Sequence, residues 1–232
     1  MEGGNLSEWY LNGGGGEYNG NCSNPCSSTN GSTSEASQEQ ARSGNWSAKL
    51  TIPGTGAVRL YRWKEPHENR EAYYSAWYFV PQRYTVNLYG WANWFQFKSA
   101  TTDGKHDPFF ILDWRNAQAT GQMYFLLTWW PGLKIEGPQP GQSGGRTWPS
   151  PVEIPVGRWF HVEVRYVCAG DFTGAIQVWQ DDVEIFKLEN IRTRYDNGDC
   201  QWSINNYAEN ISPSPVSIYI DDAVISETRV GP

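Results

Sequence analysis

The chain has 232 residues, and its 25 acidic residues outnumber its 18 basic residues, which gives a formal net charge of −7. This charge argues against a nucleic-acid-binding protein, because such proteins usually carry a strong excess of basic residues. Hydrophobic residues make up 39% of the chain and aromatic residues 15%, which is too many for a disordered protein. We therefore expect a folded protein with a substantial core.

No apolar run approaches the length needed to cross a bilayer, and the N-terminus lacks the charged and apolar segments of an export signal. We therefore expect no membrane partner, and we expect any export signal to lie outside this sequence. All-β sandwiches often reach this length as one domain, so we predict a single domain over residues 1–232. Residues 1–42 are rich in Gly, Ser and Asn and are predicted to form an irregular segment packed on that domain.

From Trp46 onward the chain is a series of segments rich in β-branched and aromatic residues, with almost no helical periodicity. The predicted strands are 46–52, 57–63, 72–80, 93–99, 108–114, 123–130, 159–168, 175–180, 184–188, 201–207 and 216–226. In 161–165 apolar and polar residues alternate, so the valines should face a core and the charged residues should face out. Asp181 and Asp182 separate two strands and are predicted to form a hairpin turn. The pattern predicts an all-β fold, an antiparallel two-sheet β-sandwich of the jelly-roll type.

The four cysteines are Cys22, Cys26, Cys168 and Cys200. Four cysteines allow three pairings, and we favour Cys22–Cys26 together with Cys168–Cys200. A zinc site is the alternative, but the sequence has no second close cysteine pair and its three histidines are scattered. Because disulfides persist in oxidising compartments, the pairing predicts a secreted, extracellular protein.

Trp and Tyr are unusually frequent, with 13 of each beside 9 Phe. Their rings join an apolar face to a polar edge, which suits a surface that binds sugar rings in water. A core that uses Trp heavily is the alternative interpretation. Trp129 and Trp130 are adjacent, so their indoles should point to opposite faces of the strand and one of them must face away from the core. With Trp114 it forms a candidate sugar platform.

Three predicted strands each place ligand-binding types of side chain on one face. The segment 93–99 places Trp94, Gln96 and Lys98 together, whereas phenylalanines occupy its other face. The other members of this predicted ligand face are Arg59, Tyr61, Trp63, Asn205 and Tyr207. Together they supply stacking surfaces, amides, cations and a phenol. An ordinary solvated face is the alternative, because alternation alone does not identify a groove.

Four stretches of the chain carry a family resemblance. They are AYYSAWYFVP at 72–81, WFQFK at 94–98, PVGRWFHVEV at 155–164 and IYIDDAVIS at 218–226. With them the chain resembles, over most of residues 40–230, the jelly-roll (concanavalin A-like) polysaccharide lyases of the heparin lyase, glucuronan lyase and alginate lyase type. The resemblance implies cleavage of a uronate polysaccharide by β-elimination. In that reaction a base removes the proton α to the carboxylate, polar groups neutralise the carboxylate, and an acid protonates the leaving oxygen. Polysaccharide is then the partner, and no organic cofactor is expected.

The same resemblance implies roles for individual residues. Gln96 matches the Gln of the family's Gln-x-His strand, and Lys98 stands where the His belongs. Tyr207 matches the Tyr of the last inner strand and is expected to act as acid or base. Lys98 is a second candidate base, because a crowded Lys can lose its proton. Arg59 opens the counterpart of the family's arginine strand and, with Asn205 and Gln96, is expected to bind or neutralise the uronate.

Two other functions fit the residues. A glycoside hydrolase needs two nearby carboxylates on one face, but Glu184 and Glu189 should face opposite ways. The second function is that of a binding module without catalysis. Jelly-roll carbohydrate-binding modules are similar to this chain in having an early acidic residue, a Ser-Gly pair and Asp on the last strand. The matching residues, for which this resemblance implies a structural calcium site, are Glu2, Ser43, Gly44, Asp221 and Asp222. We expect a monomer.

Overall fold

The structure is a computed structural model that describes residues 1–9, 26–27, 31–62, 71–104, 106–129, 145–146 and 149–232. Within these ranges the chain forms strands joined by turns and loops, and no helix. The described residues accordingly include no helix that is long and apolar enough to span a membrane.

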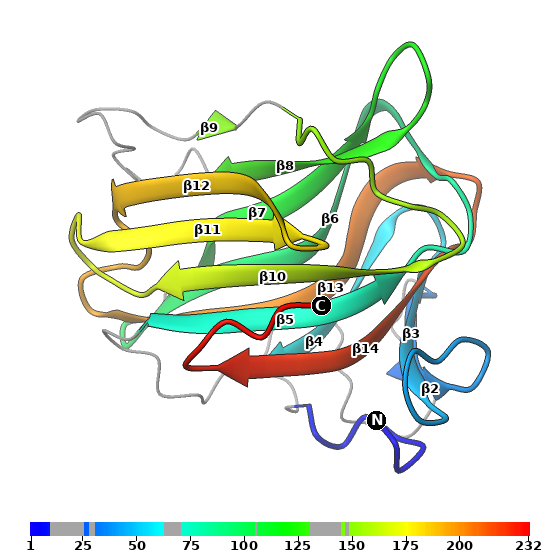
Figure 1. The fold of residues 1–232 in the computed structure, drawn as a ribbon, viewed down its shortest axis with the longest axis horizontal. Coiled ribbons are helices and arrows are strands. Elements are labelled where there is room, and N and C mark those ends of the chain that lie inside the picture. Colours follow the sequence, from blue (N-terminus) through cyan, green and yellow to red (C-terminus); the bar gives the residue numbers. More distant parts are fainter. Residues whose placement is uncertain (10–25, 28–30, 63–70, 105, 130–144, 147–148) are drawn as a thin grey trace.

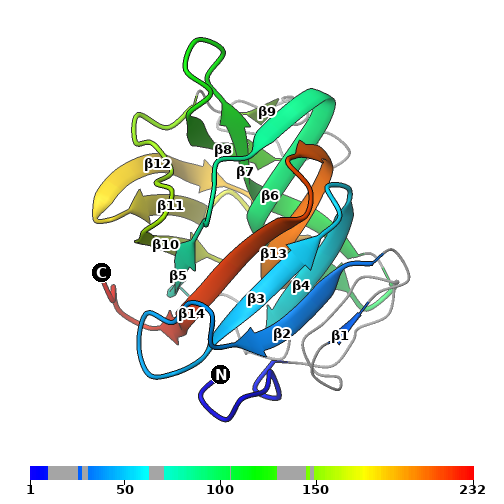
Figure 2. The ribbon, with the colours of Figure 1, turned by 90° about the vertical axis from the view of Figure 1, so that its right-hand side faces the viewer.

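The strands form two antiparallel sheets that lie one in front of the other (Figures 1 and 2). The sheet in front in Figure 1 has eight strands in the order β1 (Cys26–Ser27), β2 (Thr33–Ser37), β3 (Ser47–Ile52), β14 (Val216–Ser226), β5 (Glu71–Phe79), β10 (Trp159–Val167), β11 (Gly174–Gln180) and β12 (Val183–Ile191). The other has six strands in the order β4 (Gly56–Arg62), β13 (Gly198–Ser212), β6 (Thr85–Thr101), β7 (His106–Asn116), β8 (Met123–Trp129) and β9 (Gly145–Arg146). This arrangement confirms the predicted two-sheet sandwich.

The core lies between the two sheets and is built from the inward-facing residues of both. Phe97 of β6 stacks on Tyr166 of β10, with ring centroids 3.8 Å apart. One buried polar side chain also crosses between the layers, because Asn206 of β13 donates to the backbone oxygens of Leu50 at 3.0 Å and Val216 at 2.9 Å. Such bonds satisfy the buried amide nitrogen and tie one sheet to the other.

Each of the eleven predicted strands overlaps an observed one. The turn at Asp181 and Asp182 is also confirmed, and both residues have positive φ angles (47° and 67°), as a tight hairpin turn requires. The irregular segment predicted for residues 1–42 needs a correction, because β2 lies inside it and pairs with β3. The TSEAS sequence of β2 is mostly small or polar, so it lacks the apolar pattern of a strand and joins the sheet by backbone pairing.

A disulfide bond joins Cys168, which follows β10, to Cys200 of β13, as predicted. Since β10 and β13 belong to different sheets, the bond connects the two layers. The other predicted pair, Cys22–Cys26, includes Cys22, which lies outside the described residues.

The alternation predicted for β10 is present, but its outward-facing polar residues are not all solvated. The Glu163 side chain has no exposed surface, because the C-terminal residues cover it. Its carboxylate accepts hydrogen bonds from the backbone amides of Val230 at 2.6 Å and Gly231 at 3.2 Å. These bonds replace the water that a buried carboxylate loses.

A bulge in β6 decides which of its side chains face the core. Asn93 pairs with Asp113 of β7, whereas Phe95 pairs with Leu112, so β6 carries one extra residue at this point. Such a bulge interrupts the alternation of faces. Trp94 and Phe95 therefore both lie in the core, while Asn93 and Gln96, on either side of them, line the opposite face of the sheet.

The bulge makes the predicted position of Trp94 on the ligand face wrong. Trp94 is 1% exposed, and its ring lies 5.2 Å from that of Trp114 and 6.4 Å from that of Tyr78 in the core. Trp114 is fully buried as well, so it has no surface to offer as a sugar platform.

Replacement of Trp94 by Ala is expected to lower the free energy of unfolding by about 3–5 kcal/mol, because it leaves a large cavity in the core. Urea unfolding of the variant measures this loss. If the parent binds polysaccharide as the sequence predicts, the fraction of variant that stays folded should bind it with the same affinity. A stable variant that had lost its affinity would instead place Trp94 in a binding surface.

His161, also on the outer face of β10, makes stability depend on pH. It is 2% exposed, and its ring lies 5.2 Å from that of Trp77. Burial lowers the pKa of the imidazole below its usual 6.5, and the carboxylates of Glu163 and Asp181 only partly oppose this. Just below pH 6.5 the unfolded chain therefore binds a proton that the folded protein does not bind.

The free energy of unfolding should accordingly fall as the pH is lowered from 6.5 through the folded-state pKa of His161. His161→Gln removes this contribution, so its stability should vary less than that of the parent between neutral pH and about pH 5. Denaturant unfolding at both pH values provides the comparison. An equal loss in both proteins would assign the pH dependence to other groups.

Candidate functional site

A cleft of about 520 Å³ lies on the face of the six-stranded sheet that points away from the core. Five strands of that sheet, β4, β13, β6, β7 and β8, contribute to its lining. Of the predicted catalytic residues, Arg59, Gln96, Lys98 and Tyr207 all line it. Their convergence follows from strand pairing, because residues paired across neighbouring strands point to the same side of a sheet.

Asn205, the fifth predicted catalytic residue, lies buried under the cleft and is not part of its lining. Its Nδ2 donates to Oδ1 of Asn93 at 2.7 Å and approaches Oε1 of Gln96 at 3.5 Å. Its own Oδ1 accepts a hydrogen bond from Ser203 Oγ at 2.9 Å. Asn205 thus fixes the orientation of two amides that reach the cleft, which is the role of a positioning residue.

Tyr207 is held between a cation and an indole. The guanidinium carbon of Arg59 lies 4.6 Å from the centroid of its ring. The ring of Trp91 meets it edge to face, with centroids 4.4 Å apart, and Trp91 Nε1 donates to Glu209 at 3.0 Å. The phenol is therefore fixed in direction, and a positive charge lies close enough to stabilise negative charge that develops on its oxygen.

Positive charge predominates in the cleft. Among the described residues that line it, Arg59, Lys98 and Arg115 are cationic and Asp113 is the one anion. Asp113 accepts a hydrogen bond from Thr128 Oγ1 at 2.7 Å. A cationic cleft in a chain of net charge −7 indicates an anionic ligand, because clefts concentrate the field of the charges that line them.

The structure does not place the remaining predicted aromatic residues in the cleft lining. Tyr61 shares a face of β4 with Arg59, but it is buried and does not line the cleft. Trp129 packs partly buried against the core, so the structure does not place it on the cleft face either. Trp63 and Trp130 lie outside the described residues.

Five of the aromatic, amide and charged residues that line the cleft were not predicted from the sequence. They are Tyr89, Trp91, Asn93, Asp113 and Arg115. A signal for Asp113 and Arg115 is present, since alternation along β7 puts both on the face opposite the buried Trp114. Tyr89, Trp91 and Asn93 precede or adjoin the bulge in β6, where simple alternation fails.

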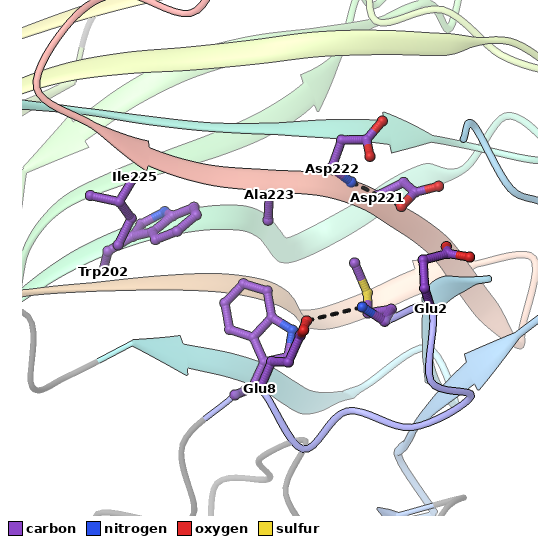
Figure 3. A pocket seen from close by; sticks show the side chains of 9 residues that line it. Glu2, Glu8, Trp202, Asp221, Asp222, Ala223 and Ile225 are labelled. Atoms are coloured by element: carbon purple, nitrogen blue, oxygen red, sulfur yellow. Dashed lines mark hydrogen bonds and ion pairs between the residues drawn. The ribbon is translucent and has the colours of Figure 1, made fainter. Parts of the chain in front are cut away.

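A second cavity, of about 590 Å³, lies between the N-terminal residues and strands β13 and β14 (Figure 3). Its lining includes the carboxylates of Glu2, Glu8, Asp221 and Asp222. This concentration of negative charge would repel an acidic polymer. This second cavity is larger than the cleft, but it is the poorer candidate for a site that binds an acidic polymer.

The predicted calcium ligands gather beside this second cavity. Ser43 Oγ donates to Asp222 at 2.7 Å, the Ser43 amide donates to Asp221 at 3.3 Å, and the Glu2 carboxylate lies against Gly44. These carboxylates thus accept hydrogen bonds from groups of the protein itself. Within the described ranges, no group of three or more His, Cys, Asp and Glu is arranged to hold a metal ion. The calcium site stays a prediction.

The chain shares its fold with proteins of known structure. Solved structures with the same fold include the endo-β-1,4-glucuronan lyase of the fungus Trichoderma reesei, which is 14% identical with a TM-score of 0.64, over 86% of this chain and 89% of that chain. An alginate lyase from a Chlorella virus is 11% identical with a TM-score of 0.57, over 83% and 89% of the two chains. Alginate lyase Aly36B is 17% identical with a TM-score of 0.56, over 86% and 84%. At such identities the likeness concerns the fold alone.

Comparison with curated protein sequences gives no match. A family model described as polysaccharide lyase, however, matches residues 1–224, which is nearly the whole chain. The chain therefore belongs to the polysaccharide lyase family.

Proposed function

We propose that this protein cleaves a uronate-containing polysaccharide by β-elimination in the cleft of the six-stranded sheet. The observation that carries the proposal is the convergence of a phenol, an ammonium group, amides and a guanidinium in one cationic cleft. These groups belong to Tyr207, Lys98, Gln96, Asn93 and Arg59. They are the types of group that β-elimination next to a carboxylate requires.

The charge of the cleft supports a uronate as the substrate. A polymer with a carboxylate on each sugar would be repelled by most of this acidic protein and attracted by the cationic cleft. The similar solved structures include a glucuronan lyase and alginate lyases, and both polymers consist of uronic acids. A neutral glucan would gain no attraction from the positive charge of the cleft.

The reaction needs three things from the cleft. Removal of the proton α to the carboxylate leaves negative charge on the carboxylate oxygens, and Arg59, Gln96 and Asn93 supply the donors that stabilise it. The electron pair then forms the double bond of an unsaturated uronate as the bond to the glycosidic oxygen breaks. That oxygen must receive a proton. Tyr207 is assigned as acid or base in these transfers, and Lys98, which lines the same cleft, as the second candidate base.

Secretion is part of the proposal. The Cys168–Cys200 disulfide supports it, because such bonds persist in oxidising compartments. An extracellular location would also bring the protein to polysaccharides that are too large to enter a cell.

Incubation with a panel of uronate and neutral polysaccharides tests the reaction. Ultraviolet absorbance reports unsaturated uronate ends, and a reducing-sugar assay reports every broken linkage. We expect absorbance to rise with at least one uronate polymer. Reducing ends without absorbance would indicate a hydrolase. Retention on a polysaccharide with neither signal would indicate a binding module.

Tyr207→Phe tests the catalytic assignment. The variant should lose activity by about 100-fold or more, because it lacks the proton that the phenol transfers. Its affinity for the polymer should stay near that of the parent, since the ring and its contacts with Arg59 and Trp91 remain. Tyr73→Phe is the matched control, because Tyr73 lies on β5 of the other sheet and bonds Glu71. Turnover of Tyr207→Phe at the parent rate would refute the assignment.

A further inference from the structure

A second and wider bulge of β6 forms one end of the cleft. In the pairing of β6 with β13, residues 87–90 together oppose the single residue Asn210. Asn210 Nδ2 donates to the backbone oxygen of Leu88 at 3.0 Å, and Asn87 Nδ2 donates to Asn210 Oδ1 at 3.3 Å. Side-chain hydrogen bonds thus hold the bulge in one shape. Bulges beside active sites commonly redirect a side chain.

The side chain that this bulge displays is Tyr89. It lines the cleft, yet it is 90% exposed. Its φ angle is +62°, a left-handed conformation that is strained for a bulky side chain. Exposure of an aromatic ring and backbone strain both reduce stability, so the fold itself gains nothing from a tyrosine here. An aromatic ring that a fixed backbone displays to water at the edge of a cleft is suited to a ligand that covers it.

Tyr89 continues a row of aromatic rings that starts at the proposed catalytic residue. Tyr207 contacts Trp91 with ring centroids 4.4 Å apart, and Trp91 stands two residues from Tyr89 on the same strand. Trp91 and Tyr89 both line the cleft. The row therefore leads away from the reacting centre toward the bulge.

A cation lies at the same end of the cleft. Arg115 lines it, and Arg115 also lines a neighbouring cavity of about 220 Å³ beside Tyr124 and Ser150. Arg115 therefore borders both the cleft and this neighbouring cavity. In a uronate polymer each ring that reaches this end would bring its own carboxylate, and a guanidinium is the natural partner for that group.

We propose that Tyr89 and Arg115 form a distal subsite for one uronate ring of the polysaccharide. The ring stacks on Tyr89 and its carboxylate pairs with Arg115. This inference rests on the proposed function and adds a residue-level basis for preferring long acidic chains. The subsite contributes to binding and takes no part in bond cleavage.

Binding of oligosaccharides of graded length tests the subsite. Alginate and glucuronan fragments from disaccharide to hexasaccharide are titrated calorimetrically into protein carrying Tyr207→Phe, so that cleavage does not intervene. Added to this background, Tyr89→Ala and Arg115→Gln should each weaken hexasaccharide binding by about tenfold, the loss of one stacked ring or one ion pair. Disaccharide binding at the reacting centre should not change. Arg115→Gln should also make the affinity less sensitive to salt.

Two further variants separate a binding role from a structural one. Leu88→Ala is the matched control, because Leu88 is 75% exposed in the same bulge and does not line the cleft. It should bind every fragment like the parent. Tyr89→Gly should raise the melting temperature, since glycine adopts a positive φ without strain, while it weakens hexasaccharide binding. A merely structural residue would not show these opposite changes.

The outcomes distinguish the subsite from the lyase reaction. Length-dependent affinity that Tyr89→Ala abolishes, in a parent protein that forms no unsaturated product, would keep the subsite and reject β-elimination. Cleavage by the parent, with the affinities of all Tyr89 and Arg115 variants unchanged for every fragment, would reject the subsite and keep the reaction.

Discussion

The composition of the cleft depends on the point where β6 departs from regular alternation. The extra residue at Trp94 and Phe95 sends both rings into the core and leaves Asn93 and Gln96 on the cleft side. The amides on either side of the bulge thereby come within reach of the one buried side chain, Asn205, that orients both. A strand without the bulge would present one of these amides to the core, where it would cost free energy. Core packing and the geometry of the cleft are therefore set by the same irregularity.

The cleft combines rigid amides with an aromatic and cationic wall. Buried hydrogen bonds fix the amides before any ligand arrives, which reduces the reorganisation that a reaction would require. Tyr207, between Arg59 and Trp91, is equally constrained. The disulfide and the Asn206 hydrogen bonds join the two sheets, so the eight-stranded sheet supports the six-stranded sheet that carries these groups. Family membership, cationic charge and this preorganised set of groups agree on one class of reaction, which no single one of them would identify.

Much of this could be predicted from the sequence, because two-residue periodicity is a local property. It located the strands and placed Gln96, Lys98, Arg59 and Tyr207 on one face. It failed for Trp94, because a bulge depends on pairing with the next strand and leaves no trace in the alternation. It placed Glu163 on the outer face correctly but did not show that the carboxylate is buried, because C-terminal residues far along the chain cover it. The aromatic richness that suggested a sugar platform at Trp114 belongs to the core instead.

The contrast between the cationic cleft and the net charge of the whole chain bears on how the proposed lyase would move through a gel of acidic polysaccharide. Networks of acidic polysaccharide retain cationic proteins by unspecific adsorption, and a protein with scattered positive patches would be immobilised wherever it first touched the network. Here the net charge is −7, whereas the described charged residues that line the cleft are three cations and one anion. The protein as a whole is therefore repelled by such a gel, and the cleft would attract a chain of the polymer. In the proposed function, mobility within the gel and selectivity for binding in the cleft then have the same electrostatic origin.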